Sequence, residues 1–146
     1  MLARFLPLDT GHGVVLVRHE ATPRLVARGQ MVVFEMEEES LGSGVYRRAG
    51  YGIEPVLAVA GDRVEFSGEG FRVNGKLRPA LPEMPTKGEM VVPENHFFVW
   101  PRFDITRRNI PAGNIAVGLM RTSMIARDQI IGRPCQRWFG LRQPEP

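Results

Sequence analysis

One stretch of the chain, residues 64–75, constrains the fold more than any other. Val64–Phe66 and Phe71–Val73 each alternate apolar and charged side chains, the pattern of a strand with one buried face. The glycine-containing segment Ser67–Gly70 separates them. The pair Asn74-Gly75 follows, and it tolerates the positive φ angles of a tight hairpin turn. The stretch therefore predicts a β-meander.

Short strand-like runs separated by turn residues continue through the remainder of the chain. Its 16 glycines and 12 prolines separate short runs of β-branched and aromatic residues. We therefore expect an all-β protein with little helix. The predicted strands are Val14–Val17, Met31–Met36, Val56–Ala60, Val64–Phe66, Phe71–Val73, Phe97–Trp100 and Asn114–Leu119.

Other segments predict connections. Pro79–Lys87 contains three prolines, which exclude a central strand and predict an extended loop. The acidic run Glu35–Ser40 leads into the glycine-rich Leu41–Gly44 and favours a solvated loop. Met124–Ile131 is expected to form a short helix.

Two segments of the second half look alike. Val92–Val99 and Ile110–Val117 each place a proline shortly before an apolar run, and both predict the beginning of a strand. In Phe97–Trp100, alternation directs apolar side chains to both faces. We expect burial on both sides, with contact to a partner or a membrane surface as the alternative. The apolar pair Trp138-Phe139 has the same two alternatives, burial or contact with a partner or a membrane surface.

Length and charge limit the function classes. A chain of 146 residues suits a single domain, 1–146, whose ends 1–12 and 141–146 we expect to be loose. The net charge is only +3, and the arginines are interleaved with acidic residues, so we expect no nucleic-acid partner. No apolar window is long enough to span a bilayer, so the chain carries no anchor of its own. Cys135 is the only cysteine, which excludes an intrachain disulfide and a cysteine zinc site, and we expect no cofactor or metal.

A first motif is similar to the beginning of histidine phosphatases. A strand at Val14–Val17 delivers Arg18-His19, and Thr22 follows shortly after. That chemistry needs a second histidine beside the first and an α/β scaffold. The other histidines are His12 and His96, and the helices of such a scaffold are missing from the pattern. The phosphatase is therefore a remote alternative.

A longer series of segments resembles the signal peptidase I superfamily, and most of all the TraF-type peptidases that mature conjugative pilins. The resemblance covers about residues 28 to 133, and its segments occur in the family's order. They are the Arg-Gly-hydrophobic strand Arg28–Phe34, the Gly-Asp segment Val56–Val64, the hairpin Phe71–Lys76, the strand Val92–Val99 and the closing Ile130–Arg133.

The resemblance implies an all-β, partly open, barrel-like signal-peptidase-type fold. In that family a peptide lies as an added strand beside the active-site strands, where backbone hydrogen bonds hold it. The chemistry comes from a serine nucleophile and a neutral lysine, whose pKa is lowered by a dry environment.

This sequence departs from the family at both catalytic positions. The segment Glu20–Leu25 matches the nucleophile box, but Glu20 stands where the serine is expected. Eight residues before Asp62, where the family has its lysine, stands Glu54. The only lysines, Lys76 and Lys87, lie elsewhere.

Two further family motifs are displaced or degraded. Ser123-Met124 is similar to the family's Ser-Met pair but lies at the wrong end of the chain. Asp104–Arg107 only partly matches the late Asp-Ser-Arg box. The resemblance therefore predicts no catalytic residue, and an inactive signal-peptidase-like domain.

Such a domain would bind an extended peptide or a pilus component of a conjugative transfer or type IV secretion system. The resemblance implies the periplasmic face of the bacterial inner membrane, with contact to the membrane surface as an option. Two carboxylates would favour a basic peptide. The residues expected around the peptide groove are Glu20, Thr22 and Pro23 on one wall, and Ile53, Glu54 and Val56 on the other.

Three alternatives stay open. The two glutamates can be solvated residues on a fold kept for its architecture. A working peptidase with an unrecognised dyad, for example one using Ser123, would still cleave propilin. Paired carboxylates could in principle act as in aspartic proteases, if Glu20 and Glu54 approach closely and bind a water. The partner's identity and the oligomeric state are not predicted.

Overall fold

The computed structural model describes residues 4–9, 14–19, 26–42, 44–101 and 111–134. Most of these residues are in strands, one α-helix is present among them, and the described strands do not close into a barrel. The predicted all-β, partly open fold is confirmed. The elements are β1 Arg4–Asp9, β2 Val14–His19, β3 Met31–Met36, β4 Glu39–Gly42, β5 Val45–Arg47, β6 Gly50–Pro55, β7 Ala58–Val59, β8 Arg63–Ser67, β9 Gly70–Val73, β10 Lys76–Arg78, β11 Gly88–Val91, β12 His96–Phe98, α1 Ala112–Ser123, β13 Met124–Ala126, the 3₁₀ turn η1 Arg127–Gln129 and β14 Ile130–Pro134.

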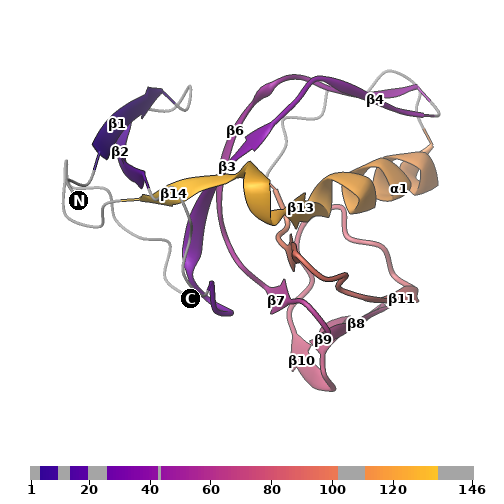
Figure 1. Cartoon of the computed structure of the whole chain (residues 1–146). Helices are drawn as coiled ribbons and strands as arrows, with labels where there is room; N and C mark the ends of the chain where they lie inside the picture. Colours follow the sequence, from indigo (N-terminus) through magenta and orange to yellow (C-terminus); the bar gives the residue numbers. More distant parts are fainter. Residues whose placement is uncertain (1–3, 10–13, 20–25, 43, 102–110, 135–146) are drawn as a thin grey trace.

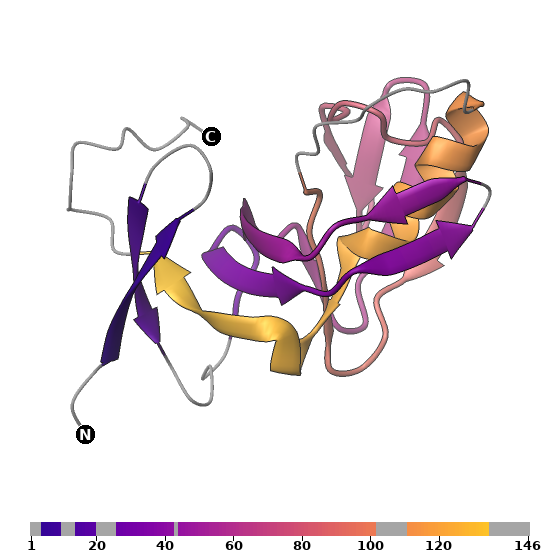
Figure 2. The ribbon, with the colours of Figure 1, turned by 90° about the horizontal axis from the view of Figure 1, so that it is seen from above.

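The strands form antiparallel sheets. A five-stranded sheet has the order β1-β2-β14-β3-β6, and a four-stranded sheet has the order β10-β9-β8-β11. A smaller, three-stranded sheet has the order β13-β12-β7. It is connected to the five-stranded sheet at two points, because β7 follows β6 in the chain and β13 leads through η1 into β14. In Figure 2, β14 reaches out to the β1–β2 hairpin, which stands apart from the rest of the molecule. In Figure 1, the β4–β5 hairpin extends the β3–β6 pair along α1.

The four-stranded sheet contains the predicted meander. Ser67 pairs with Gly70, which closes the β8–β9 hairpin around a two-residue turn. Asn74 and Gly75 have φ angles of 49° and 85°, as the turn chemistry predicted. The alternating pattern therefore predicted β8 and β9 and the Asn74-Gly75 turn, whereas the first turn is shorter than the four residues Ser67–Gly70 expected, and the bounds of β10 were not predicted.

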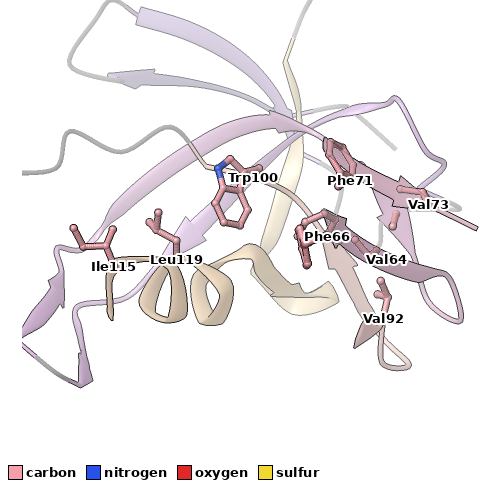
Figure 3. Close-up of a cluster of buried hydrophobic side chains, with 10 residues drawn as sticks. Val64, Phe66, Phe71, Val73, Val92, Trp100, Ile115 and Leu119 are labelled. Atoms are coloured by element: carbon pink, nitrogen blue, oxygen red, sulfur yellow. The ribbon is translucent and has the colours of Figure 1, made fainter. Parts of the chain in front are cut away.

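The core has two main clusters on either side of residues 97–100. Phe98 and Trp100 belong to the larger cluster, of which Figure 3 labels Trp100, Phe66 and Phe71. Phe98 makes edge contacts with Phe66 and Phe71. Val99 is fully buried in the second cluster, with Phe97 packed against it. Burial on both faces of this segment, as predicted, is confirmed. Beyond these strands, the second cluster contains Val32, Phe34, Val56, Ile125 and Ile130.

The predicted strand Asn114–Leu119 is wrong, because these residues lie in α1. Ile115 and Leu119 are four residues apart, so a helix places both on the same face, and both are buried in the larger cluster. Gly118 allows the helix to approach β5 closely, since a Cβ there would come within 2.9 Å of Val45. Burial of one helical face therefore outweighed the strand preference of the β-branched residues, and the likeness of Ile110–Val117 to Val92–Val99 did not reflect a shared structure.

Of the helix predicted at Met124–Ile131, only Arg127–Gln129 is helical, as the 3₁₀ turn η1, and the remainder of the prediction is wrong. Its first residues form β13, which pairs with β12, and its last residues begin β14. A continued helix would need Ser123 O to accept a hydrogen bond from Arg127 N. Instead, Ser123 O accepts one from Val99 N, and Arg127 N donates to Asn95 O.

Other boundaries moved. Of the predicted strand Val56–Ala60, only Ala58–Val59 is a strand, and the preceding strand β6 was missed. The solvated loop predicted over Glu35–Ser40 is only partly correct: the acidic residues are exposed, but Glu35–Met36 belong to β3 and Glu39–Ser40 to β4. Leu41 and Gly42, at the beginning of the glycine-rich segment, also belong to β4 rather than to a plain loop. Within the end 1–12, expected to be loose, Arg4–Asp9 forms β1. Pro79–Lys87 connects β10 and β11 without a strand, as predicted.

Candidate functional site

Strand β6 ends the five-stranded sheet, and in the part of the chain that the structure describes it has a strand partner on one side only, β3. Val56 N donates to Gln30 O on the β3 side at 2.9 Å, whereas Leu57 N donates to Phe98 O on the other side at 2.8 Å. Backbone groups alternate along a strand, so Tyr51 and Ile53 direct their N–H and C=O groups away from β3. This outward side of β6 is the candidate site.

The three site residues predicted around this strand do not share one environment. Ile53 is partly exposed and packs against Val33 and Ile131 on one face of the sheet. Glu54 is opposite Val32, so its half-buried side chain leaves β6 from the other face. Val56 is only 1% exposed and belongs to the core, so it is not accessible to a peptide.

The other predicted wall, Glu20, Thr22 and Pro23, lies outside the described residues. The proximity of Glu20 to Glu54 is therefore not tested. Glu54 itself takes part in an interaction within the chain. Its carboxylate has several acceptor positions, so more than one donor can share it.

Glycines contribute a feature of β6 that the sequence prediction did not single out. Gly52 faces the Phe34 ring, and a Cβ at this position would lie 2.3 Å from Phe34 Cζ. A Cβ at Gly50 would meet no heavy atom of the described part of the chain within 4 Å. Tyr51, between them, is 45% exposed. The pattern Gly-Tyr-Gly-Ile was the available signal, because glycine inside a strand often marks a close approach of another backbone.

The buried carboxylate of Asp62 fixes the turn that follows β7. Asp62 is 5% exposed and accepts hydrogen bonds from Arg28 Nε at 2.6 Å and from Arg28 Nη2 at 2.5 Å. Val59 N and Asn74 Nδ2 also donate to it, each at 2.9 Å. The hydrogen bond from Arg28 is the main cause that lowers the pKa of Asp62 from 3.8 to about 2, against the opposing effect of desolvation.

Asp62 joins three segments of the chain that carry the family resemblance. Arg28 comes from the segment before β3, and Asn74 from the turn of the meander. All four oxygen–donor contacts are with groups of the chain itself, so this carboxylate is occupied in positioning the backbone. Its role in the structure is architectural. It holds the segment before β3 and the end of β7 against the β9–β10 turn of the meander.

No serine–lysine pair is present among the described residues. Ser123 is fully buried at the end of α1, and its hydroxyl donates to Met120 O at 2.7 Å. Ser67 donates to a backbone carbonyl of its own turn. Lys76 and Lys87 are both exposed, in β10 and in the proline-rich loop. No described serine hydroxyl is hydrogen-bonded to a lysine.

Within residues 4–9, 14–19, 26–42, 44–101 and 111–134, no three His, Cys, Asp or Glu side chains gather as metal ligands would. Over those residues, no helix is long and apolar enough to cross a membrane.

Comparison with known proteins gives no family. No family model matches the chain, and no curated protein matches it. The resemblance to signal peptidases therefore depends on the five segments quoted above and on their order.

Proposed function

We propose that this protein is a catalytically inactive, signal-peptidase-like domain that binds an extended peptide by strand addition to β6. The observation that carries the proposal is the outward backbone of Tyr51 and Ile53 on the last strand of the sheet. An added strand would satisfy these donors and acceptors, as in other proteins that bind peptides at a sheet edge.

The absence of peptidase activity is the second part of the proposal. Glu54 occupies the position of the family's lysine, and a carboxylate cannot serve as the amine base that activates a serine. Ser123 is 0% exposed, and its hydroxyl is already bound to a carbonyl, so it is not positioned to attack a substrate. Both observations favour binding without cleavage.

The partner follows from the resemblance and from charge. A pilin or another component of a conjugative transfer or type IV secretion system, on the periplasmic face of the inner membrane, is the partner that the resemblance implies. Glu54 lies on the last strand and would favour a basic residue beside it in the bound strand.

A cleavage-and-capture assay tests the proposal. The purified protein is mixed with propilin and signal-peptide candidates from its own genomic neighbourhood, and mass spectrometry identifies both released fragments and retained peptides. We expect retention without cleavage. Specific cleavage that disappears in Ser123→Ala would overturn the proposal in favour of an active peptidase.

N-methylation of a retained peptide tests strand addition directly. Methylation removes one backbone donor at a time, and in a strand only every second donor faces the neighbouring strand. We expect binding to be lost with a period of two residues along the peptide. A uniform or irregular response would contradict strand addition to β6.

Glu54→Gln tests the charge preference. The variant should weaken binding of a basic peptide about two- to fivefold at low salt, the range of an exposed cross-strand charge pair. Glu69→Gln is the matched control, because Glu69 is 77% exposed in the β8–β9 turn. Equal affinities for the two variants would remove Glu54 from the site.

The histidine phosphatase is not favoured by the fold. The described residues form an all-β structure, which does not provide the α/β scaffold that this chemistry needs. His19 ends β2 in the five-stranded sheet, while His96 begins β12 in another sheet.

A further inference from the structure

From the two faces of β6 we infer a side-chain pattern for the bound peptide: a basic residue, then an aliphatic residue, then two unrestricted residues, then an aromatic residue. The inference rests on the proposed function, because it assumes a strand added to β6. It takes that strand as antiparallel, like every strand pair that the structure describes.

The aromatic position follows from Gly50. Even-numbered residues of β6 direct their backbone groups to β3, so they form the non-hydrogen-bonded pairs with an added strand. Opposed side chains are closest in such pairs, with Cα atoms about 4.5 Å apart. Gly50 has no side chain, and no heavy atom of the residues that the structure describes lies within 4 Å of the position of its absent Cβ. A large flat side chain opposite Gly50 can therefore cover this space, as aromatic residues do over glycines in sheets.

Gly52 does not offer the same space. The Phe34 ring occupies the position where its Cβ would be. The ring is fully buried, and it belongs to the core of the protein itself. Two glycines that look equivalent in the sequence thus have different roles. The space at Gly52 is filled by Phe34, whereas no side chain of the described residues fills the space at Gly50.

The aliphatic and basic positions follow from the next residues along β6. Ile53 projects from the face opposite to Gly50, beside Val33 and Ile131, which form an apolar surface. A β-branched residue opposite Ile53 extends that surface and satisfies the outward backbone groups of Ile53. Glu54 follows, and its carboxylate favours a basic residue opposite it. Ile53 and Gly50 are three residues apart, which sets the spacing of the aliphatic and aromatic positions.

Two peptides of identical composition test the inference. Both have seven residues with threonine at each end. The first reads lysine, valine, serine, threonine, phenylalanine between the ends, and the second exchanges valine and phenylalanine. Each well-matched cross-strand pair changes affinity by a factor of about 1.4 to 5. We expect the first peptide to bind about fivefold more tightly in fluorescence anisotropy.

Gly50→Val is the critical variant. Its side chain enters open space and no positive φ opposes it, so the fold should be retained, as a circular dichroism spectrum and a thermal melt will check. The variant should bind both peptides within about twofold of each other, because the space over residue 50 is filled. Gly68→Val is the matched control. Gly68 also has open space around its Cβ position but lies in the β8–β9 turn, and it should leave the preference unchanged.

The outcomes separate this inference from the proposed function. If neither peptide binds and no peptide is retained in the capture assay, strand addition itself is wrong. If both peptides bind the unmodified protein equally, the protein binds strands but the pattern is wrong. If the preference survives in Gly50→Val, the aromatic residue does not lie over Gly50 and the inference is overturned.

Discussion

Two strands at sheet margins, β6 and β11, differ in how they present themselves to another chain. On β11, Glu89 forms an ion pair with Arg63 of the neighbouring strand, and both side chains are mostly exposed. Arg63 also contacts Glu65 at 3.0 Å. Charged side chains of this kind discourage a further strand from pairing. On β6, the residues Gly50–Ile53 carry no charge, and the charged Glu54 and then Pro55 follow only at the end of the strand.

This difference separates a stabilising region, the four-stranded sheet, from β6, where we propose that a peptide binds. The four-stranded sheet buries alternate apolar side chains against Phe98 and Trp100 and covers its other face with charge. The β6 strand contributes few side chains to the core, and Gly52 is shaped around Phe34. Substitutions should therefore affect folding in one region and peptide affinity in the other.

The largest effect is expected from Phe98→Ala. Phe98 is fully buried at the centre of the larger cluster, and removing its ring should lower the free energy of unfolding by about 3 to 5 kcal/mol. Urea denaturation followed by fluorescence measures this change. Ile53→Ala is the comparison, since Ile53 is partly exposed and should cost far less stability while weakening peptide binding. Similar losses of stability in the two variants would remove the distinction between the regions.

Adding one methyl group to β6 gives the next effect. In Gly52→Ala the new Cβ collides with the Phe34 ring, and the overpacked core should lose about 1 to 3 kcal/mol. Gly50→Ala places the same group in open space and should change stability by less than about 0.5 kcal/mol. Thermal melts of the pair test whether these two glycines differ as described. A destabilised Gly50→Ala would contradict it.

Acid sensitivity should arise from Asp62. Its pKa is about 2 in the folded protein, below the ordinary value of 3.8. The carboxylate therefore contributes stability above about pH 4, and this contribution of about 2 kcal/mol is lost as the pH falls from 4 to 2. Denaturation curves across this range should show a steep fall that is absent in Asp62→Asn. A parallel fall in both proteins would assign the acid sensitivity to other carboxylates.

The smallest effect on stability is expected beside the edge strand β11, where Arg63 pairs with Glu89. Arg63→Ala removes an exposed ion-pair network and should leave the free energy of unfolding almost unchanged, because water and salt screen exposed charges. Its informative readout is association, since β11 loses the cation that neutralises Glu65 and Glu89. Analytical ultracentrifugation should find the variant as monodisperse as the parent chain, because the two opposed glutamates still repel an added strand. A new dimer would mean that Arg63 itself protects this margin.

Local patterns predicted the parts of the fold that depend on neighbouring residues. Strand β3 was predicted with its observed ends, and the β8–β9 and β9–β10 turns follow from Gly68-Glu69 and Asn74-Gly75. The helix α1 was missed because Ile115 and Val117 favour strands locally, whereas the burial of one helical face is decided by distant residues. Of the predicted site, Ile53 and Glu54 lie on the last strand of the sheet, but Val56 belongs to the core.

The sequence by itself determined that this chain folds mainly into strands, that residues 64–75 form a meander, and that Phe97–Trp100 is buried on both sides. These follow from alternation and turn chemistry, which act over a few residues. Only the tertiary structure decided that β6 ends a sheet, that Gly50 and Gly52 differ, and that Arg28 binds Asp62 across 34 positions. Such features depend on which strands become neighbours, and burial over the whole chain sets that arrangement.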